Sequence, residues 1–135
     1  EVEVNHAARG DYTALFIAAQ GGHEAVVRLL LAHAAVDPNQ AEEDGMTPLY
    51  LAAQKGHEAV VRLLLAHAAV DPNQAEEDGM TPLYLAAQKG HEAVVRLLLA
   101  HAAIDPNQAN QNGATPLFMA AQKGNEAIVR LLLAH

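Results

Sequence analysis

Histidine is the residue type in this chain whose spacing most suggests metal binding or proton transfer. Four histidines stand 34 residues apart, at His33, His67, His101 and His135. Positions repeated at such a spacing fall on neighbouring units of a stack, and packed helices lie roughly 8–10 Å apart. Two imidazoles at that separation cannot share one metal ion at about 2.0–2.1 Å from each. We therefore predict no metal site and interpret these histidines as helix C-terminal residues, which the helix dipole favours.

Covalent catalysis needs a nucleophile, and the chain has few candidates. It contains no Ser and no Cys, and its recurring hydroxyl, Thr47 with its copies, is predicted to cap a helix. There is no glycine-rich loop that could cradle a phosphate. The acidic stretch 71–78 offers oxygen ligands for calcium but lacks the EF-hand spacing, with its central Gly and closing Glu. The residues therefore predict a protein without catalytic activity, metal or cofactor.

The charge balance argues against further classes of partner. Lys and Arg number 8 against 16 Asp and Glu, for a formal net charge of -8, whereas a nucleic-acid partner needs clustered basic residues. An anionic membrane surface is disfavoured for the same reason. No apolar run is long enough to cross a bilayer, and the start of the chain lacks the basic head and apolar core of a signal peptide. We expect an intracellular, cytoplasmic protein with no nucleic-acid or membrane partner.

The chain consists of tandem copies of one segment. Residues 23–56 recur letter for letter at 57–90, and again with a few changes at 91–124. Such a period is typical of stacked repeats, in which each unit contacts only its neighbours. The predicted units are the tail of a preceding repeat at 1–7 and four repeats at 8–41, 42–75, 76–109 and 110–135, the last of them truncated.

Each unit carries the sequence signals of two helices. Thr47 is a good N-cap, and Pro48 follows at the first helical position, where its missing N–H costs nothing. Lys55 and Gly56 end this short helix, because Lys suits the C-terminal end of a helix and Gly tolerates a positive φ. A second helix with an apolar stripe is predicted over about 57–67.

A two-helix unit of this size cannot bury its apolar face alone. Stacking of neighbouring units provides the core, so the sequence predicts an all-α repeat solenoid of helix-turn-helix units. The acidic runs Glu42–Asp44 and Glu76–Asp78 precede the turn glycines and are expected to form a solvated acidic ladder along projecting loops, or fingers. Such a ladder would favour a basic partner segment. Tyr50 and Tyr84 are expected to pack between units with the phenol oxygen at the surface.

The repeated unit resembles the ankyrin repeat. The residues that carry the resemblance are Gly45-Met46-Thr47-Pro48-Leu49, Ala52-Ala53, Gly56-His57, Val60-Val61 and Leu63-Leu64-Leu65. The resemblance implies an L-shaped stack of paired antiparallel helices, with β-turn fingers projecting from one edge. It also implies that the histidines of the Gly-His position are structural and bond to neighbouring loops, at His23, His57 and His91.

The units depart from the family pattern after the second helix. Ala stands where the family often has Gly, at Ala34, Ala68 and Ala102. We expect a different cap geometry there, in which the extra residue of the 34-residue unit absorbs the turn. Some ankyrin repeats are modified by an asparaginyl hydroxylase at a position that resembles Asn39, Asn73 and Asn107, each of which follows a Pro here.

The resemblance implies a non-catalytic scaffold that binds a partner protein through its finger tips and concave inner-helix face. The predicted contact residues are Glu43, Asp44, Met46, Gln54, Lys55 and His67, with their copies Glu77, Asp78, Met80, Gln88, Lys89 and His101. The partner is expected to be a protein with a basic segment.

Two alternatives remain open. The near-identity of the units also fits a structural spacer within a longer array, without a dedicated partner. Perfect repetition is typical both of an engineered repeat protein and of recent duplication. Neither end carries a polar capping repeat, so a final helix that contains Leu131–Leu133 would expose apolar surface. We expect either end-to-end association between molecules or neighbouring units that are missing from this segment.

Overall fold

The computed structural model describes residues 1–135 and contains eight helices stacked in consecutive pairs. The first helices of the pairs, which we call the inner row, are α1 (Ala14–Gln20), α3 (Pro48–Lys55), α5 (Pro82–Lys89) and α7 (Pro116–Gln122). The second helices, the outer row, are α2 (Glu24–Leu31), α4 (Glu58–Ala66), α6 (Glu92–Leu99) and α8 (Glu126–Leu133). This arrangement confirms the predicted all-α repeat solenoid.

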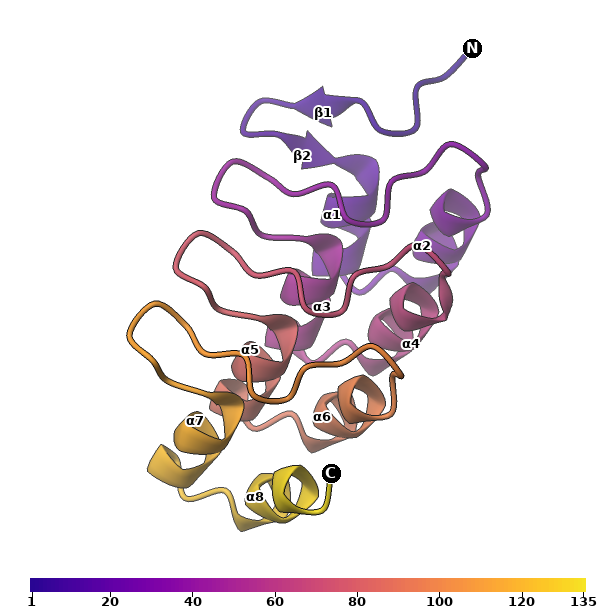
Figure 1. The fold of residues 1–135 in the computed structure, drawn as a ribbon. Helices are drawn as coiled ribbons and strands as arrows, with labels where there is room; N and C mark the ends of the chain where they lie inside the picture. Colours follow the sequence, from indigo (N-terminus) through magenta and orange to yellow (C-terminus); the bar gives the residue numbers. More distant parts are fainter.

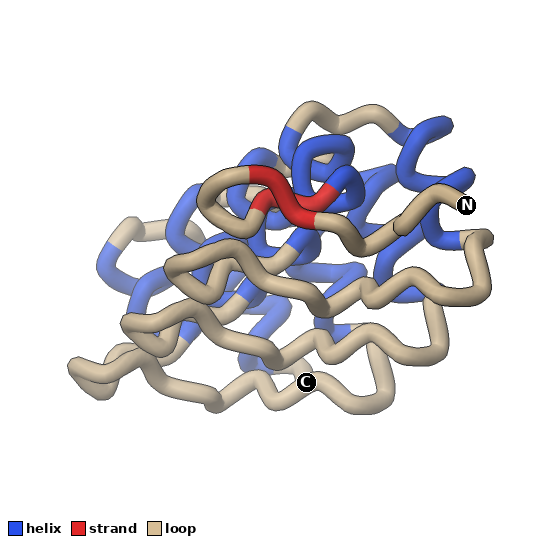
Figure 2. The backbone as a smooth tube through the Cα atoms, turned by 90° about the horizontal axis from the view of Figure 1, so that it is seen from above, coloured by secondary structure: helices blue, strands red, loops and turns tan.

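The two rows lie side by side along the whole stack. Each helix contacts the next helix of its own row, and each inner helix contacts the outer helix of its own pair. The fingers project from the inner row on the side away from the outer row (Figure 1). Seen from above, the fingers and their connecting loops run as parallel tan loops across the molecule (Figure 2). The stack therefore presents one edge made of loops and one face made of outer helices.

The helix ends follow from the residues that the sequence places there. The Thr47 hydroxyl accepts the N–H of Tyr50 over 3.1 Å, and Pro48 is the first residue of α3. Gly56 ends α3 in the left-handed region with a φ of 74°. Helix α4 begins one residue after His57 and ends one residue before its predicted limit. The predicted cap, first-position proline and terminal glycine are confirmed.

The main core lies between the two rows. Ala52 and Ala53 are fully buried, and such small side chains let neighbouring helices approach closely. Val60, Val61 and Leu64 of the outer helix α4 belong to the same cluster. A second cluster consists of the buried residues Phe16, Tyr50, Leu51, Tyr84, Leu85 and Met119, with Tyr12, Met46, Met80 and Ala114 packed against it. Each unit therefore contributes to two continuous cores that run through the stack.

The turn after each outer helix has the altered geometry that the alanines predict. Ala68 does not adopt a positive φ, and the non-glycine residue that does is Asp11. Instead, the N–H of Val70 donates to the carbonyl of His67 over 3.2 Å and closes a turn. The expected difference in cap geometry is confirmed.

The first finger differs from the others because it contains two short strands. Strands β1 (Ala7–Ala8) and β2 (Tyr12–Thr13) pair antiparallel. Gly10 and Asp11, with φ values of 87° and 66°, form the turn between them, and Asp is among the residues that tolerate this region. No helix in the stack has the length and apolar character that a membrane crossing requires.

Candidate functional site

Each finger of the second and third units closes around a buried carboxylate. Oε1 of Glu42 accepts the N–H groups of Asp44 and Met46 over 2.8 and 2.9 Å, and Glu42 is only 4% exposed. Glu76 makes the same two bonds in the next finger. The prediction that the whole acidic run lies at the solvated tips is therefore wrong for the first acidic residue of each run. The loop turns its N–H groups inward, and the carboxylate satisfies them.

The fingers are joined to one another by backbone hydrogen bonds. The N–H of Glu43 donates to the carbonyl of Gly10 over 3.1 Å, and the N–H of Glu77 donates to the carbonyl of Asp44 over 3.0 Å. Gln111 repeats this bond to Asp78 over 3.0 Å. The fingers therefore form a continuous edge in which each loop is fixed by its predecessor.

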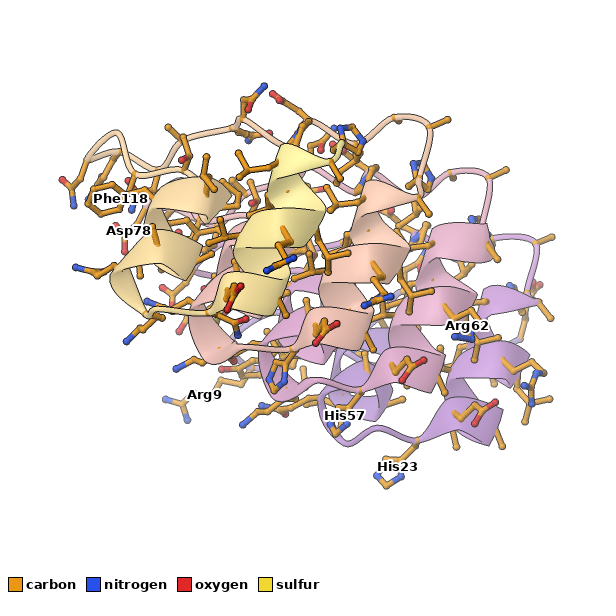
Figure 3. All side chains as sticks on the ribbon, turned by 90° about the horizontal axis from the view of Figure 1, so that it is seen from below. Arg9, His23, His57, Arg62, Asp78 and Phe118 are labelled. Carbon is orange, nitrogen blue, oxygen red and sulfur yellow. The ribbon has the colours of Figure 1, made fainter.

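Four carboxylates are exposed on the fingers of the second and third units, and none has a cationic partner. They are Glu43, Asp44, Glu77 and Asp78. Every arginine ion pair lies within an outer helix, where Arg62 pairs with Glu58 over 3.0 Å and its copies do the same. Asp78 and Arg62 consequently lie on opposite sides of the molecule (Figure 3). The fingers carry an unneutralised negative surface.

The exposed carboxylates interact with each other. The Asp44 charge, followed by partial desolvation and by Asp78, raises the pKa of Glu77 above its ordinary value of 4.5. In the fourth unit the repulsion is relieved, because Gln111 replaces the corresponding glutamate and its Nε2 donates to Oδ1 of Asp78 over 3.4 Å. We call Glu43, Asp44, Glu77 and Asp78 the finger carboxylates.

An aromatic layer lies behind the finger carboxylates. Tyr50 and Tyr84 are buried, in contrast to the expected surface position of their phenol groups. Burial, followed by the charges of Glu76 and Asp78, raises the pKa of Tyr50 to about 12. Met46 and Met80 are half-buried against the same cluster. They therefore present only part of their side chains at the finger surface.

The predicted contact residues on the inner helices lie at the opposite end from the fingers. Gln54 and Lys55 are the last two residues of α3, and eight residues at about 1.5 Å each place the two helix ends about 12 Å apart. Gln88 and Lys89 repeat this position on α5. The inner row thus joins a negative edge at its N-terminal ends to exposed lysines at its C-terminal ends.

The two predicted contact histidines do not join this surface. His67 is the C-cap of the outer helix α4, and Nδ1 of its ring accepts the N–H of Ala69 over 3.1 Å. His101 makes the same bond to Ala103 after α6. The fold therefore separates these histidines from the fingers and gives them a capping role. No group of three or more His, Cys, Asp or Glu side chains is placed to hold a metal ion.

The histidines of the Gly-His position connect neighbouring units, as the resemblance implies. Nε2 of His57 lies 3.0 Å from the carbonyl oxygen of Gln20, and that of His91 lies 2.9 Å from the carbonyl oxygen of Gln54. A carbonyl only accepts, so each ring donates. Asn125 replaces the histidine in the last unit and caps its own helix α8 instead.

Asparagine provides a second connection between units that sequence reasoning missed. Nδ2 of Asn39 donates to the carbonyl of Ala69 over 2.7 Å, and Oδ1 accepts the N–H of Asp71 over 2.8 Å. Asn5 and Asn73 repeat both bonds. In the sequence, the regularly repeated Pro-Asn pair could have indicated this role. The partner of each asparagine, however, lies 30 residues further along the chain and comes close only when the units stack.

Comparison with protein-family models identifies repeats over the full length of the chain. The model for ankyrin repeats, in three copies, matches residues 1–76 and 67–135. A comparison with curated protein sequences found no match. Ankyrin-repeat proteins are in general non-catalytic modules that bind other proteins. With its helix pairs, projecting fingers and histidine links between units, this chain belongs to the ankyrin-repeat family.

Proposed function

We propose that this chain is a non-catalytic scaffold that binds a partner protein through a basic segment lying along the finger edge. The observation that carries the proposal is the set of finger carboxylates, which are exposed, adjacent and without a cationic partner. Charge complementarity of this kind speeds encounter and favours partners of opposite sign. The partner segment is therefore rich in Lys or Arg.

The rigidity of the edge supports the same proposal. Backbone bonds from Glu43 and Glu77 fix each finger to the preceding one, so a partner does not have to order these loops when it binds. A surface that is ordered in advance loses less conformational entropy on association. Met46 and Met80, half-buried beside the carboxylates, add adaptable apolar contact.

The lysines at the far ends of the inner helices extend the proposed contact surface. Lys55 and Lys89 are exposed and stand outside every ion pair of the chain. A partner that crosses the inner row would meet negative charge at the fingers and positive charge at the helix ends. The proposed contact set on this surface is Glu43, Asp44, Met46, Gln54 and Lys55, with their copies Glu77, Asp78, Met80, Gln88 and Lys89. His67 and His101, whose rings cap the ends of the outer helices, lie outside this set.

A labelled-protein titration tests this proposal. An unstructured peptide rich in Lys and Arg is added to ¹⁵N-labelled protein, and amide shifts are followed by NMR. We expect the largest shifts at 43–46 and 77–80, with smaller ones at the neutral finger 110–113. Charge reversal at the four finger carboxylates should abolish the shifts. Equal shifts over the outer row, or unchanged shifts after charge reversal, would refute the finger edge as the binding surface.

A structural spacer is the second candidate function. The identity of the second and third units supports it, because units that bind a partner usually diversify at their contact positions. A spacer needs only the inter-unit contacts and not the finger charges. The peptide titration separates the two functions, since a spacer would show no localised response at the fingers.

A further inference from the structure

Methionine is the only sulfur-containing residue type in this chain, which has three methionines and no cysteine. Met46 and Met80 directly follow the turn glycines of the second and third fingers, and both side chains are half-buried. The third, Met119, lies in α7 and is only 6% exposed. A dissolved oxidant therefore meets two accessible thioethers and one that the fold protects.

The two accessible methionines lie in the same fingers as the finger carboxylates. Tyr12 has the corresponding position in the first finger, and Ala114 has it in the last. Neither of these fingers contributes a finger carboxylate. The side chains that an oxidant can change therefore stand only where the chain presents its negative surface.

Each of these methionines shares its anchor with a finger carboxylate. The backbone N–H of Met46 donates to Oε1 of the buried Glu42 over 2.9 Å, and the N–H of Asp44 donates to the same oxygen over 2.8 Å. The third finger repeats this pair of bonds. One short loop thus carries both groups, so a change in the packing of Met46 acts on the loop that presents Asp44.

The methionine side chains pack against an apolar and aromatic environment. Met46 and Met80 lie against the second core cluster, to which the buried Tyr50 and Tyr84 belong. A thioether is apolar and polarisable and suits such contacts. Oxidation replaces it with a polar sulfoxide, and a polar group is costly to bury without a hydrogen-bond partner. The oxidised side chain therefore turns away from the cluster toward water.

We propose that Met46 and Met80 are a paired oxidation site through which peroxide weakens partner binding at the fingers. The sulfur lone pair forms a bond to one oxygen of hydrogen peroxide as the O–O bond breaks. The leaving hydroxide takes the proton from the transferred oxygen and departs as water. Sulfur is thereby oxidised to the sulfoxide and the peroxide is reduced to water. Methionine sulfoxide reductases reverse the change.

The effect on binding rests on the proposed function of the fingers, whereas the oxidation itself does not. A finger whose methionine has left the cluster loses the apolar contact that fixes its loop to the inner row. Its carboxylate then has to be ordered when a partner binds, which costs conformational entropy. The backbone bond from Glu77 to Asp44 remains, so the stack stays folded and the loss is confined to the fingers.

Peptide mapping tests the selectivity of the oxidation. Folded protein is treated with hydrogen peroxide, the reaction is quenched, and tryptic peptides are analysed by mass spectrometry. Met46 and Met80 lie in the peptides 29–55 and 63–89, which are identical in sequence and are measured together, whereas Met119 lies in the distinct peptide 97–123. We expect the identical peptides to gain oxygen well before peptide 97–123.

The consequence is tested with the Lys- and Arg-rich peptide. Its affinity for the unmodified protein should fall severalfold after oxidation and return after treatment with methionine sulfoxide reductases for both sulfoxide epimers. Met46→Leu/Met80→Leu keeps a similar side-chain volume without sulfur, so its affinity should not respond to peroxide. The matched control Met119→Leu should keep the full response. If the double variant is unfolded by circular dichroism, Met46→Leu and Met80→Leu are compared singly, and each should lose part of the response.

Failure of the proposed function would be seen separately, as a lack of peptide binding before any oxidation. The urea midpoint then tests the oxidation site, because peroxide should lower the midpoint of the unmodified protein and leave that of Met46→Leu/Met80→Leu unchanged. Oxidation of Met119 as fast as the other two would overturn the proposal. Unchanged peptide affinity after oxidation of both finger methionines, or an equal response in the Leu variant, would do the same.

Discussion

Glu77 donates its backbone N–H to the carbonyl oxygen of Asp44 over 3.0 Å, while the side-chain carboxylates of the same two residues repel each other. The two effects act in opposite directions on one contact between fingers. The backbone bond holds the loops together, and the acidic side chains are concentrated as a result. The fold therefore maintains a charge distribution that the side chains alone would oppose.

The first prediction concerns the acid titration of Glu77. Its pKa lies above 4.5 mainly because of Asp44, so Asp44→Asn should lower the Glu77 pKa toward that value. The folded state binds this proton more tightly than the unfolded state. Protonation of Glu77 removes its repulsion with Asp44, and this stabilising effect is therefore complete below pH 4.5. The effect is lost as the pH rises through the folded-state pKa of Glu77. Carboxyl NMR titration measures the shift.

A control for this titration removes a carboxylate of the first finger, outside the set of finger carboxylates. Asp11 lies on the first finger and is not among the charges that raise the Glu77 pKa, so Asp11→Asn should leave the titration unchanged. High ionic strength should lower the Glu77 pKa in the unmodified protein, because exposed charges are screened. An unaltered midpoint after Asp44→Asn would contradict the interpretation of the fingers as a coupled acidic edge.

The second prediction concerns an orphan oxygen behind the second finger. At the last interface between units, Nδ2 of Asn110 donates to the hydroxyl oxygen of Tyr84 over 3.3 Å. One interface earlier, Tyr50 has the position of Tyr84 and Glu76 has the position of Asn110. At the first interface these two positions hold Phe16 and Glu42, and Oε2 of Glu42 is buried without a partner. Phe16→Tyr would supply a hydroxyl donor.

We expect Phe16→Tyr to raise the free energy of unfolding by about 1 kcal/mol, the usual net value of a hydrogen bond. Urea denaturation measures the change. The matched control is Phe118→Tyr, because Phe118 has the same position in the last unit, where it is exposed and no following finger is present. If both changes stabilised the protein equally, the orphan oxygen would not be the cause.

The third prediction follows from the burial of Tyr50. The pKa of Tyr50 rises from its ordinary value of 10.0 to about 12. The folded state therefore holds the Tyr50 proton more tightly than the unfolded state does. The resulting contribution to the free energy of unfolding is present below about pH 10 and is lost as the pH rises through 12. Absorbance at high pH should show a late-titrating tyrosine signal that disappears in Tyr50→Phe. Glu76→Gln should lower this pKa only partly, because burial is the largest cause.

The fourth prediction concerns the glycine at the tip of each finger. A Cβ on Gly45 would lie 3.2 Å from Cα of Glu76 in the next finger, whereas a Cβ on Gly113 would meet nothing within 4 Å. Both glycines have positive φ values, so both changes to Ala carry about 1 kcal/mol of backbone strain. Gly45→Ala should cost roughly 1 kcal/mol more by overpacking. Equal losses of stability in urea would show that the close approach between fingers is unimportant.

The elements of this fold that the sequence predicts are those specified by local residues. Thr47, Pro48 and Gly56 define one helix through short-range chemistry, and the 34-residue period defines the stack. The burial of Glu42 could not be predicted, because a run of three acidic residues ordinarily indicates a solvated loop. Its burial depends on inward-facing N–H groups, which only the folded loop brings together.

The candidate site was predictable in part for a related reason. Finger residues such as Glu43 and Asp44 were expected at the surface from their place before the turn glycine, and they are exposed. His67 was grouped with them by its position in the unit, although it lies on the outer row as a cap. Placing a residue on one row or the other requires the path of the chain after each helix, which neither composition nor periodicity provides.

The most direct test of the central claim compares two neutralised variants in binding to the Lys- and Arg-rich peptide. In the first variant the finger carboxylates become Gln and Asn, the residues that unit four carries at Gln111 and Asn112. In the second, the four outer-row glutamates that pair with arginine become Gln, for the same change in net charge.

We predict that the finger variant binds the peptide at least about tenfold more weakly, since exposed ion pairs contribute up to about 1 kcal/mol each. The outer-row variant should bind within about twofold of the unmodified protein, because its arginine-paired charges lie away from the fingers. Isothermal titration calorimetry at fixed salt measures both affinities. Equal losses in the two variants would contradict the account, because they would show that net charge alone, and not the finger edge, attracts the peptide.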